Sequence, residues 1–163
     1  MASTLTQFLD VRLNEAQAYT SSLFQPSIAL HSPYALSEEL AKYSINIAME
    51  KNYPLSVHFM ESLEERQWCD NSMGKFAPFF EEMLSIKKSL WTGKEFCALL
   101  PNNSLIVHGT FANDDELTIL REKESSIIHC PVSNRLLTHE RLSLNHLNYY
   151  GFNIALATDG LSS

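Results

Sequence analysis

The sequence lacks the short motifs that mark several common kinds of function. Only five glycines occur, and none of them falls in the spacing Gly-x-Gly-x-x-Gly or Gly-x-x-x-x-Gly-Lys-Ser/Thr, which excludes the phosphate-binding loops of Rossmann and P-loop proteins. The three cysteines, Cys69, Cys97 and Cys130, are odd in number and far apart, so they predict neither a disulfide framework nor a Cys-x-x-Cys metal knuckle. We therefore expect free thiols in a reducing compartment.

Basic charge and long apolar runs are also scarce. Twelve Lys and Arg stand against 19 Asp and Glu, a formal net charge of −7, so the chain offers no basic surface for a nucleic-acid backbone. No apolar run approaches the roughly 18 residues that cross a bilayer, and the first residues have neither a basic nor an apolar signal region. We expect a soluble, cytoplasmic protein that binds neither nucleic acid nor membrane.

What is present suits one folded unit. The chain has 163 residues, of which 45% are hydrophobic and 19% charged, enough for a stable core and too apolar for disorder. It shows no internal repeat and no low-complexity tract, so we expect a single domain over residues 1–163.

Short apolar segments alternate with longer amphipathic ones along the whole chain. Strands are predicted at 27–30, 54–57, 104–107, 125–128 and 153–157. Helices are predicted at 5–23, after a cap at Ser37, in two or three pieces within 62–100, after a capping box at 113–116, and from Thr138 to a stop at Gly151. An aromatic stripe over residues 76–84 is expected in the core.

This alternation predicts a parallel α/β sheet, either doubly wound or a (β/α) barrel. Polar residues follow each predicted strand: His31, His58, His108, Cys130 with Ser133 and Asn134, and Asp159. A barrel brings all of these to one rim, so we favour the barrel. A complete one takes about 250 residues and eight strands. Five predicted strands therefore indicate a partial barrel, a fragment of a larger protein.

The rim residues suggest metal chemistry. His58, His108 and Asp159 supply the imidazole and carboxylate ligands of a divalent-metal site. The alternative for any one of them is a cap or loop residue bonded to backbone. Glu61, three residues after His58, could move protons at such a site. Its alternative is a helix-start charge, the interpretation that we favour for Glu64 and Glu65.

Other polar positions are less specific. His31 with Tyr34 forms either a pocket wall or a turn, and Ser133 with Asn134 either binds a ligand or satisfies loop backbone. We expect His129, His139 and His146 to be structural or exposed.

Taken together, these motifs resemble the amidohydrolase superfamily, in its chlorohydrolase and aminohydrolase (deaminase) branch. Within the branch the stretch is most similar to the aminofutalosine deaminases of menaquinone biosynthesis. The resemblance runs from about residue 27 to the end and rests on His31-Ser-Pro-Tyr34, His58-Phe-Met-Glu61, Val107-His108, His129-Cys-Pro-Val-Ser-Asn134 and Ala157-Thr-Asp-Gly-Leu-Ser-Ser163.

The resemblance implies a fold and roles by position. The chain corresponds to strands four to eight of a metal-dependent hydrolase (β/α)8 TIM barrel. His58 is implied as a metal ligand, and Asp159 as a metal ligand that also takes a proton from the attacking water. His108 is implied to steer the hydroxide and Glu61 to protonate the ring nitrogen as the amine leaves. The positions implied to bind substrate are His31, Tyr34, Ser133 and Asn134.

The implied activity is deamination of an aminated purine-type heterocycle or nucleoside by a metal-activated hydroxide, with one divalent ion, Zn or Fe. Chlorohydrolase or amide hydrolase chemistry on the same scaffold is the alternative, and so is a non-catalytic binding or scaffold domain. The family's His-x-His pair is absent from these 163 residues, so we expect the isolated fragment to bind metal weakly and to be inactive.

The implied activity requires a small-molecule substrate. Separately, the open sheet edges predict a homo-oligomer. We expect an uncovered inner face that carries Ile28, Leu55, Ile106 and Ile154.

Overall fold

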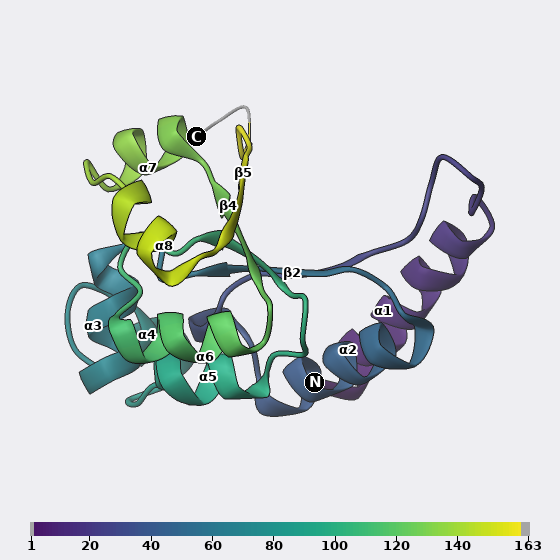
Figure 1. The fold of residues 1–163 in the computed structure, drawn as a ribbon. Coiled ribbons are helices and arrows are strands. Elements are labelled where there is room, and N and C mark those ends of the chain that lie inside the picture. Colours follow the sequence, from purple (N-terminus) through teal and green to yellow (C-terminus); the bar gives the residue numbers. More distant parts are fainter. Residues whose placement is uncertain (1, 161–163) are drawn as a thin grey trace.

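Five parallel strands form one sheet in the order in which they occur along the chain (Figure 1). A computed structural model describes residues 2–160. The strands are β1 (Ile28–Leu30), β2 (Leu55–Phe59), β3 (Leu105–His108), β4 (Ser126–His129) and β5 (Asn153–Leu156). A doubly wound sheet reverses its strand order at a switch point, whereas this order runs in one direction, as in a barrel wall. The predicted partial barrel is confirmed. Residues 161–163, the end of the last motif, lie outside the described residues.

One helix precedes the first strand, and the others connect successive strands. The helices are α1 (Ala2–Gln17), the short 3-10 turn η1 (Pro33–Ala35), α2 (Glu38–Lys51), α3 (Leu63–Asn71), α4 (Phe76–Leu84), α5 (Gly93–Leu99), α6 (Asp114–Glu122), α7 (Pro131–Leu137) and α8 (Leu144–Tyr150). Helices α3 to α6 lie together on one side of the strands (Figure 1). Among residues 2–160, none of these helices is both long and apolar enough to cross a membrane.

The face of the sheet that packs on the helices differs from the predicted arrangement. Ile28 pairs with Leu55, and Ile106 pairs with Val57, so these side chains share one face, and all of them are buried in the core. The prediction that Ile28, Leu55 and Ile106 line an uncovered inner face is therefore wrong. Ile154, paired with Ile127, lies on the same helix-facing side.

The opposite face carries smaller and more polar side chains. These are Ala29, Ser56, His58, Leu105, Val107, Ser126, Ile128, Asn153 and Ala155, all exposed or half-buried. Because each strand shows every second residue on one face, the strand sequence Leu-Ser-Val-His-Phe at 55–59 already alternates between the two environments. This alternation of apolar and polar residues was the sequence signal that could have identified the face that packs on the helices.

Local capping explains where several helices begin and end. Ser37 accepts a hydrogen bond from the Leu40 N–H and begins α2, and Asn113 with Glu116 forms the predicted capping box of α6. Gly151, in the left-handed region at φ 72°, ends α8 as predicted.

Three helical predictions need correction. The first helix ends at Gln17 rather than at residue 23. A single helix over 138–150 is wrong: Pro131 starts α7, which ends at a cap on Thr138, and Ser143 starts α8. The aromatic stripe at 76–84 is only partly in the core, because Phe80 is buried while Phe79 is 54% exposed.

Candidate active site

The candidate site lies at the carboxyl ends of the strands. His58 is the last residue but one of β2, and His108 is the last residue of β3. Glu61 follows β2, and Asp159 follows β5. Two of these residues have left-handed backbones, His108 at φ 71° and Asp159 at φ 62°. Non-glycine residues rarely adopt this conformation, and it is concentrated at functional sites. The predicted convergence on one rim is thus present in the fold.

Three close approaches connect the four side chains. His58 Nε2 is 3.9 Å from Asp159 Oδ1, and His108 Nε2 is 3.8 Å from Asp159 Oδ2. Glu61 Oε1 is 3.6 Å from His108 Nε2. All three distances exceed that of a hydrogen bond. One ligand atom from each of His58, His108 and Asp159 lies within 4.8 Å of the others, as needed around a single cation.

Outer hydrogen bonds orient both imidazoles toward this space. His58 Nδ1 donates to the His31 carbonyl oxygen at 3.0 Å, and His108 Nδ1 donates to Asn134 Oδ1 at 2.8 Å. Each bond leaves the Nε2 lone pair directed at the site, the usual arrangement of metal-binding histidines. His108 Nε2 is buried and has no hydrogen-bond partner among residues 2–160.

The donor set therefore fits a divalent metal. Two ring nitrogens and a carboxylate oxygen are the ligand types that a divalent ion such as zinc would take from His58, His108 and Asp159. An unpartnered buried imidazole nitrogen is otherwise costly, and a metal ion satisfies it.

Ser133 and Asn134 are both fully buried and bonded to site side chains. The Ser133 hydroxyl donates to Asp159 Oδ2 at 2.8 Å, while Asn134 holds His108. The start of α7 thus orients two of the three candidate ligands. Direct contact of Ser133 and Asn134 with a substrate stays a prediction.

His31 and Tyr34 lie beside the candidate site. The His31 ring lies 5.9 Å from that of His58 and meets the Tyr34 ring edge-on at 5.8 Å. Burial raises the pKa of the Tyr34 hydroxyl, so this group remains a neutral donor near neutral pH. The turn alternative is confirmed by η1, while a role of His31 and Tyr34 as a pocket wall stays a prediction.

The remaining histidines are structural or exposed. His129 is buried at the end of β4, and its pKa is lowered by burial and by nearby His108, which favours the neutral ring. His146, on α8, bonds Asp114 Oδ1 at 3.0 Å on the surface, and His139 is exposed.

Glu65 lies in the first turn of α3, after the Ser62 cap, as predicted for a helix-start charge. It is also only 1% exposed, which the sequence did not indicate. Its carboxylate accepts the backbone N–H of Glu61 at 2.9 Å. Burial raises the Glu65 pKa to about 7, against the opposing effect of hydrogen bonds from the Glu61 and Met60 backbones. The Ser-x-x-Glu spacing indicated a cap, but not this burial.

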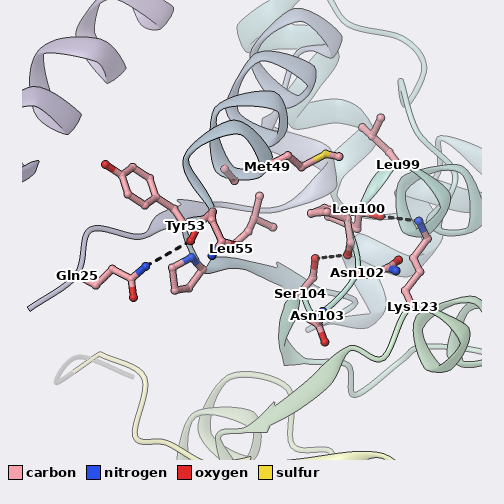
Figure 2. A pocket seen from close by; sticks show the side chains of 14 residues that line it. Gln25, Met49, Tyr53, Leu55, Leu99, Leu100, Asn102, Asn103, Ser104 and Lys123 are labelled. Atoms are coloured by element: carbon pink, nitrogen blue, oxygen red, sulfur yellow. Dashed lines mark hydrogen bonds between the residues drawn. The ribbon is translucent and has the colours of Figure 1, made fainter.

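A cavity of about 870 Å³ lies elsewhere, at the amino ends of β2 and β3 (Figure 2). Leu55, Leu100 and Ser104 line it together with Lys123, whose ammonium already donates to the carbonyl oxygens of Ala98 and Leu100. The titratable cluster is at the opposite ends of the strands. The chemistry therefore points to the rim rather than to this cavity.

Comparisons with known proteins identify the family of the chain. Residues 6–163 match the amidohydrolase family. An aminodeoxyfutalosine deaminase from Nitratiruptor sp. is 39% identical over 153 residues, which is 93% of this chain and 37% of that protein. An adenosine deaminase from Helicobacter pylori is 34% identical over 160 residues, 94% of this chain and 39% of that protein.

The fold agrees equally well. A crystal structure of Helicobacter pylori aminofutalosine deaminase in complex with methylthio-coformycin superposes with a TM-score of 0.93 at 31% identity, covering 98% of this chain and 41% of that one. The chain thus spans about two-fifths of the length of the relatives that it matches. By its strand order, its rim residues and a match over nearly all of its residues, the chain belongs to the amidohydrolase family.

Proposed function

We propose that the protein containing this chain hydrolytically deaminates an aminated purine-type nucleoside, such as aminodeoxyfutalosine or adenosine. The observation that carries the proposal is the convergence of two imidazoles and two carboxyl groups, His58, His108, Glu61 and Asp159, on one rim of the barrel wall. The names of the similar proteins, which are deaminases of such nucleosides, support the substrate class.

One divalent metal ion, Zn or Fe, belongs to this proposal. His58 and Asp159 are its proposed ligands in the chain, and His108 Nε2 is near enough to add a third. When bound, such an ion lowers the pKa of a water molecule toward neutrality, so that the water can attack the amine-bearing carbon. No His-x-His sequence occurs within the 163 residues, so we propose that this chain alone binds metal weakly and does not turn over.

The chain's own residues supply proton transfer and orientation. Asp159 Oδ2, held by the Ser133 hydroxyl, accepts the proton of the attacking water. His108, held by Asn134, orients the oxygen that adds to the ring carbon. Glu61 donates a proton to the ring nitrogen, the proton held by Asp159 passes to the amino group, and the remaining proton of the added hydroxyl returns to Glu61. Ammonia then leaves and a ring carbonyl forms, so that one water is consumed for each ammonia released.

Cellular location and partners are part of the same proposal. All three cysteines are buried free thiols, which supports a reducing, cytoplasmic compartment. The partner is a small nucleoside, and self-association is expected from the sheet edges at β1 and β5.

The test measures substrate loss, together with released ammonia or chloride, for the full-length protein loaded with zinc or iron. The panel includes aminodeoxyfutalosine, adenosine, 5'-deoxyadenosine, a chlorinated heterocycle and a cyclic amide. We expect turnover of at least one of the adenine nucleosides, with ammonia and the matching oxo-nucleoside in equal amounts. Turnover confined to the chlorinated compound or the amide would refute deamination, and no turnover of any compound would refute hydrolysis at this site.

A further inference from the structure

Three helices of the chain begin with the same spacing of a polar cap and a glutamate three residues later. In α5 and α6 the arrangement is a regular capping box: the Thr92 N–H donates to Glu95 Oε2 at 3.0 Å, and the Asn113 N–H donates to Glu116 Oε2 at 3.0 Å. In both, the glutamate holds its own cap residue. Glu116 in addition pairs with Arg66 of α3 at 2.7 Å, whereas Glu95, among the described residues, bonds only within its own helix end.

In α3 the glutamate reaches one residue farther back. Ser62 still accepts the Glu65 N–H at 3.2 Å, but the Glu65 carboxylate accepts the N–H of Glu61, which precedes the cap. Glu65 therefore holds the backbone of Glu61, the proposed proton donor, rather than the cap residue of its own helix.

The peptide that Glu65 holds is constrained on both sides. Its N–H, from Glu61, bonds Glu65, and its carbonyl oxygen, from Met60, accepts the N–H of Phe111 at 2.9 Å. Met60 itself is fully buried, with a left-handed backbone at φ 47°. A non-glycine residue keeps such a conformation only where its surroundings impose it.

Within the described residues, an unpartnered carboxyl oxygen sets Glu65 apart from the two capping glutamates, because Glu116 is as fully buried but both of its oxygens accept from Arg66. The second carboxyl oxygen of Glu65, Oε1, is buried and lacks a hydrogen-bond partner among residues 2–160, which carries a desolvation cost that a solvated capping glutamate avoids. Glu95, with the same local geometry, stands on the surface. The structural effect of this buried acid is that it holds the Met60–Glu61 peptide.

We propose that Glu65 is a positioning residue: it fixes the Met60–Glu61 peptide, so that the Glu61 carboxyl is held 3.6 Å from His108 Nε2. The inference deepens the proposed function, because it concerns the residue that delivers the proton there. Glu65 touches neither substrate nor metal and acts only through Glu61. A displacement of a catalytic group by about 1 Å can reduce a rate by about 100-fold.

The test uses three variants of the full-length protein. Glu65→Met keeps the volume and suits a buried position but removes the acceptor, whereas Glu65→Gln keeps an acceptor oxygen. Glu95→Met removes the matched capping glutamate of α5, far from the proposed chemistry. We expect E65M to lower kcat by about 10- to 100-fold with little change in KM or metal content. We expect E65Q to retain kcat near the wild-type value and E95M to leave it unchanged.

Hydrogen exchange gives a readout that does not depend on activity. In E65M the Glu61 amide loses its acceptor, so a peptide containing Glu61 should exchange faster, while E65Q and E95M should match the wild type there. Unchanged exchange in E65M, or a kcat loss in E65Q as large as that in E65M, would overturn the proposal. If the wild-type protein deaminates no nucleoside, the proposed function fails, and the exchange of this amide still decides whether Glu65 holds Glu61.

Discussion

Single hydrogen bonds decide which atoms of the candidate site are available for chemistry. The bond from His58 Nδ1 to a backbone carbonyl and the bond from His108 Nδ1 to Asn134 each commit one ring nitrogen, and so present the other. His58, His108 and Asp159 were predictable because each lies at or just after the carboxyl end of a strand. The roles of Asn134 and Ser133 as holders of these groups were not, because hydrogen bonds between α7 and the strand ends depend on the folded arrangement.

Asn134→Ala should weaken both metal binding and stability. The change removes the acceptor of His108 Nδ1 and leaves a buried donor unpaired, at a cost of about 1–3 kcal/mol in the free energy of unfolding. We expect zinc affinity of the metal-free full-length protein to fall by about 10- to 100-fold. Zinc titration and urea unfolding measure the two effects. Asn148→Ala, at an exposed position of α8, is the control, and equal affinities in the two variants would contradict the assigned contact.

Glu65 should make stability depend on pH. Its folded pKa, about 7, lies above the ordinary value of 4.5, so the folded state binds this proton more tightly than the unfolded state does. The stabilisation is complete below pH 4.5 and is lost as pH rises through 7, in total about 3 kcal/mol. Urea unfolding of the wild-type protein at a series of pH values, compared with Glu65→Gln, measures it. A constant difference between the two proteins across this range would contradict the buried acid.

At the scale of elements, helix starts were more predictable than helix ends. Ser37 and the Asn113–Glu116 box are short-range patterns, so sequence alone located them. The break between α7 and α8 was missed because threonine is a common residue at the start of a helix. Here Thr138 instead caps the carboxyl end of α7. The exposure of Phe79 could not be predicted, since it depends on which neighbours α4 meets in the folded chain.

Gly93 should be required where α5 meets α6. A Cβ at this position would lie 1.9 Å from Glu116 Oε1, and Glu116 is fixed by its capping box and by the buried ion pair with Arg66 at 2.7 Å. Gly93→Ala should therefore lower the free energy of unfolding by about 2 kcal/mol. Lys94→Ala, exposed in the same turn, should change it by less than about 0.5 kcal/mol. A Gly93→Ala protein with wild-type stability in urea would show that the two helices separate easily.

At the scale of the whole molecule, the barrel wall is asymmetric. Helices cover the face of Leu55, Val57 and Ile106, and the opposite face carries Ser56 and His58. The fold class followed from the alternation of strands and helices. The face of each strand was assigned wrongly, because short apolar runs such as Ile-Ala-Leu at 28–30 do not state which side meets the helices.

Residues 1–163 produced alone should self-associate. Strands β1 and β5 are the edges of this sheet, and the face that carries Ala29 and Val107 is incompletely covered within the described residues. Open parallel edges pair readily with other chains. Sedimentation at micromolar concentration should therefore show dimers or larger species. A single monomeric boundary would contradict this expectation and would indicate that the edges are protected in solution.

The most direct test of the account is the effect of Asp159→Asn on nucleoside deamination by the full-length, metal-loaded protein. Asp159 is 3.9 Å from His58 and 3.8 Å from His108, and the account makes it both ligand and proton acceptor. Asparagine preserves its shape and its bond with Ser133 but removes the base. We expect kcat/KM for the best adenine nucleoside to fall by about 100- to 10,000-fold, with folding unchanged by circular dichroism. A folded Asp159→Asn protein that retains kcat/KM within tenfold of the wild type would contradict this account.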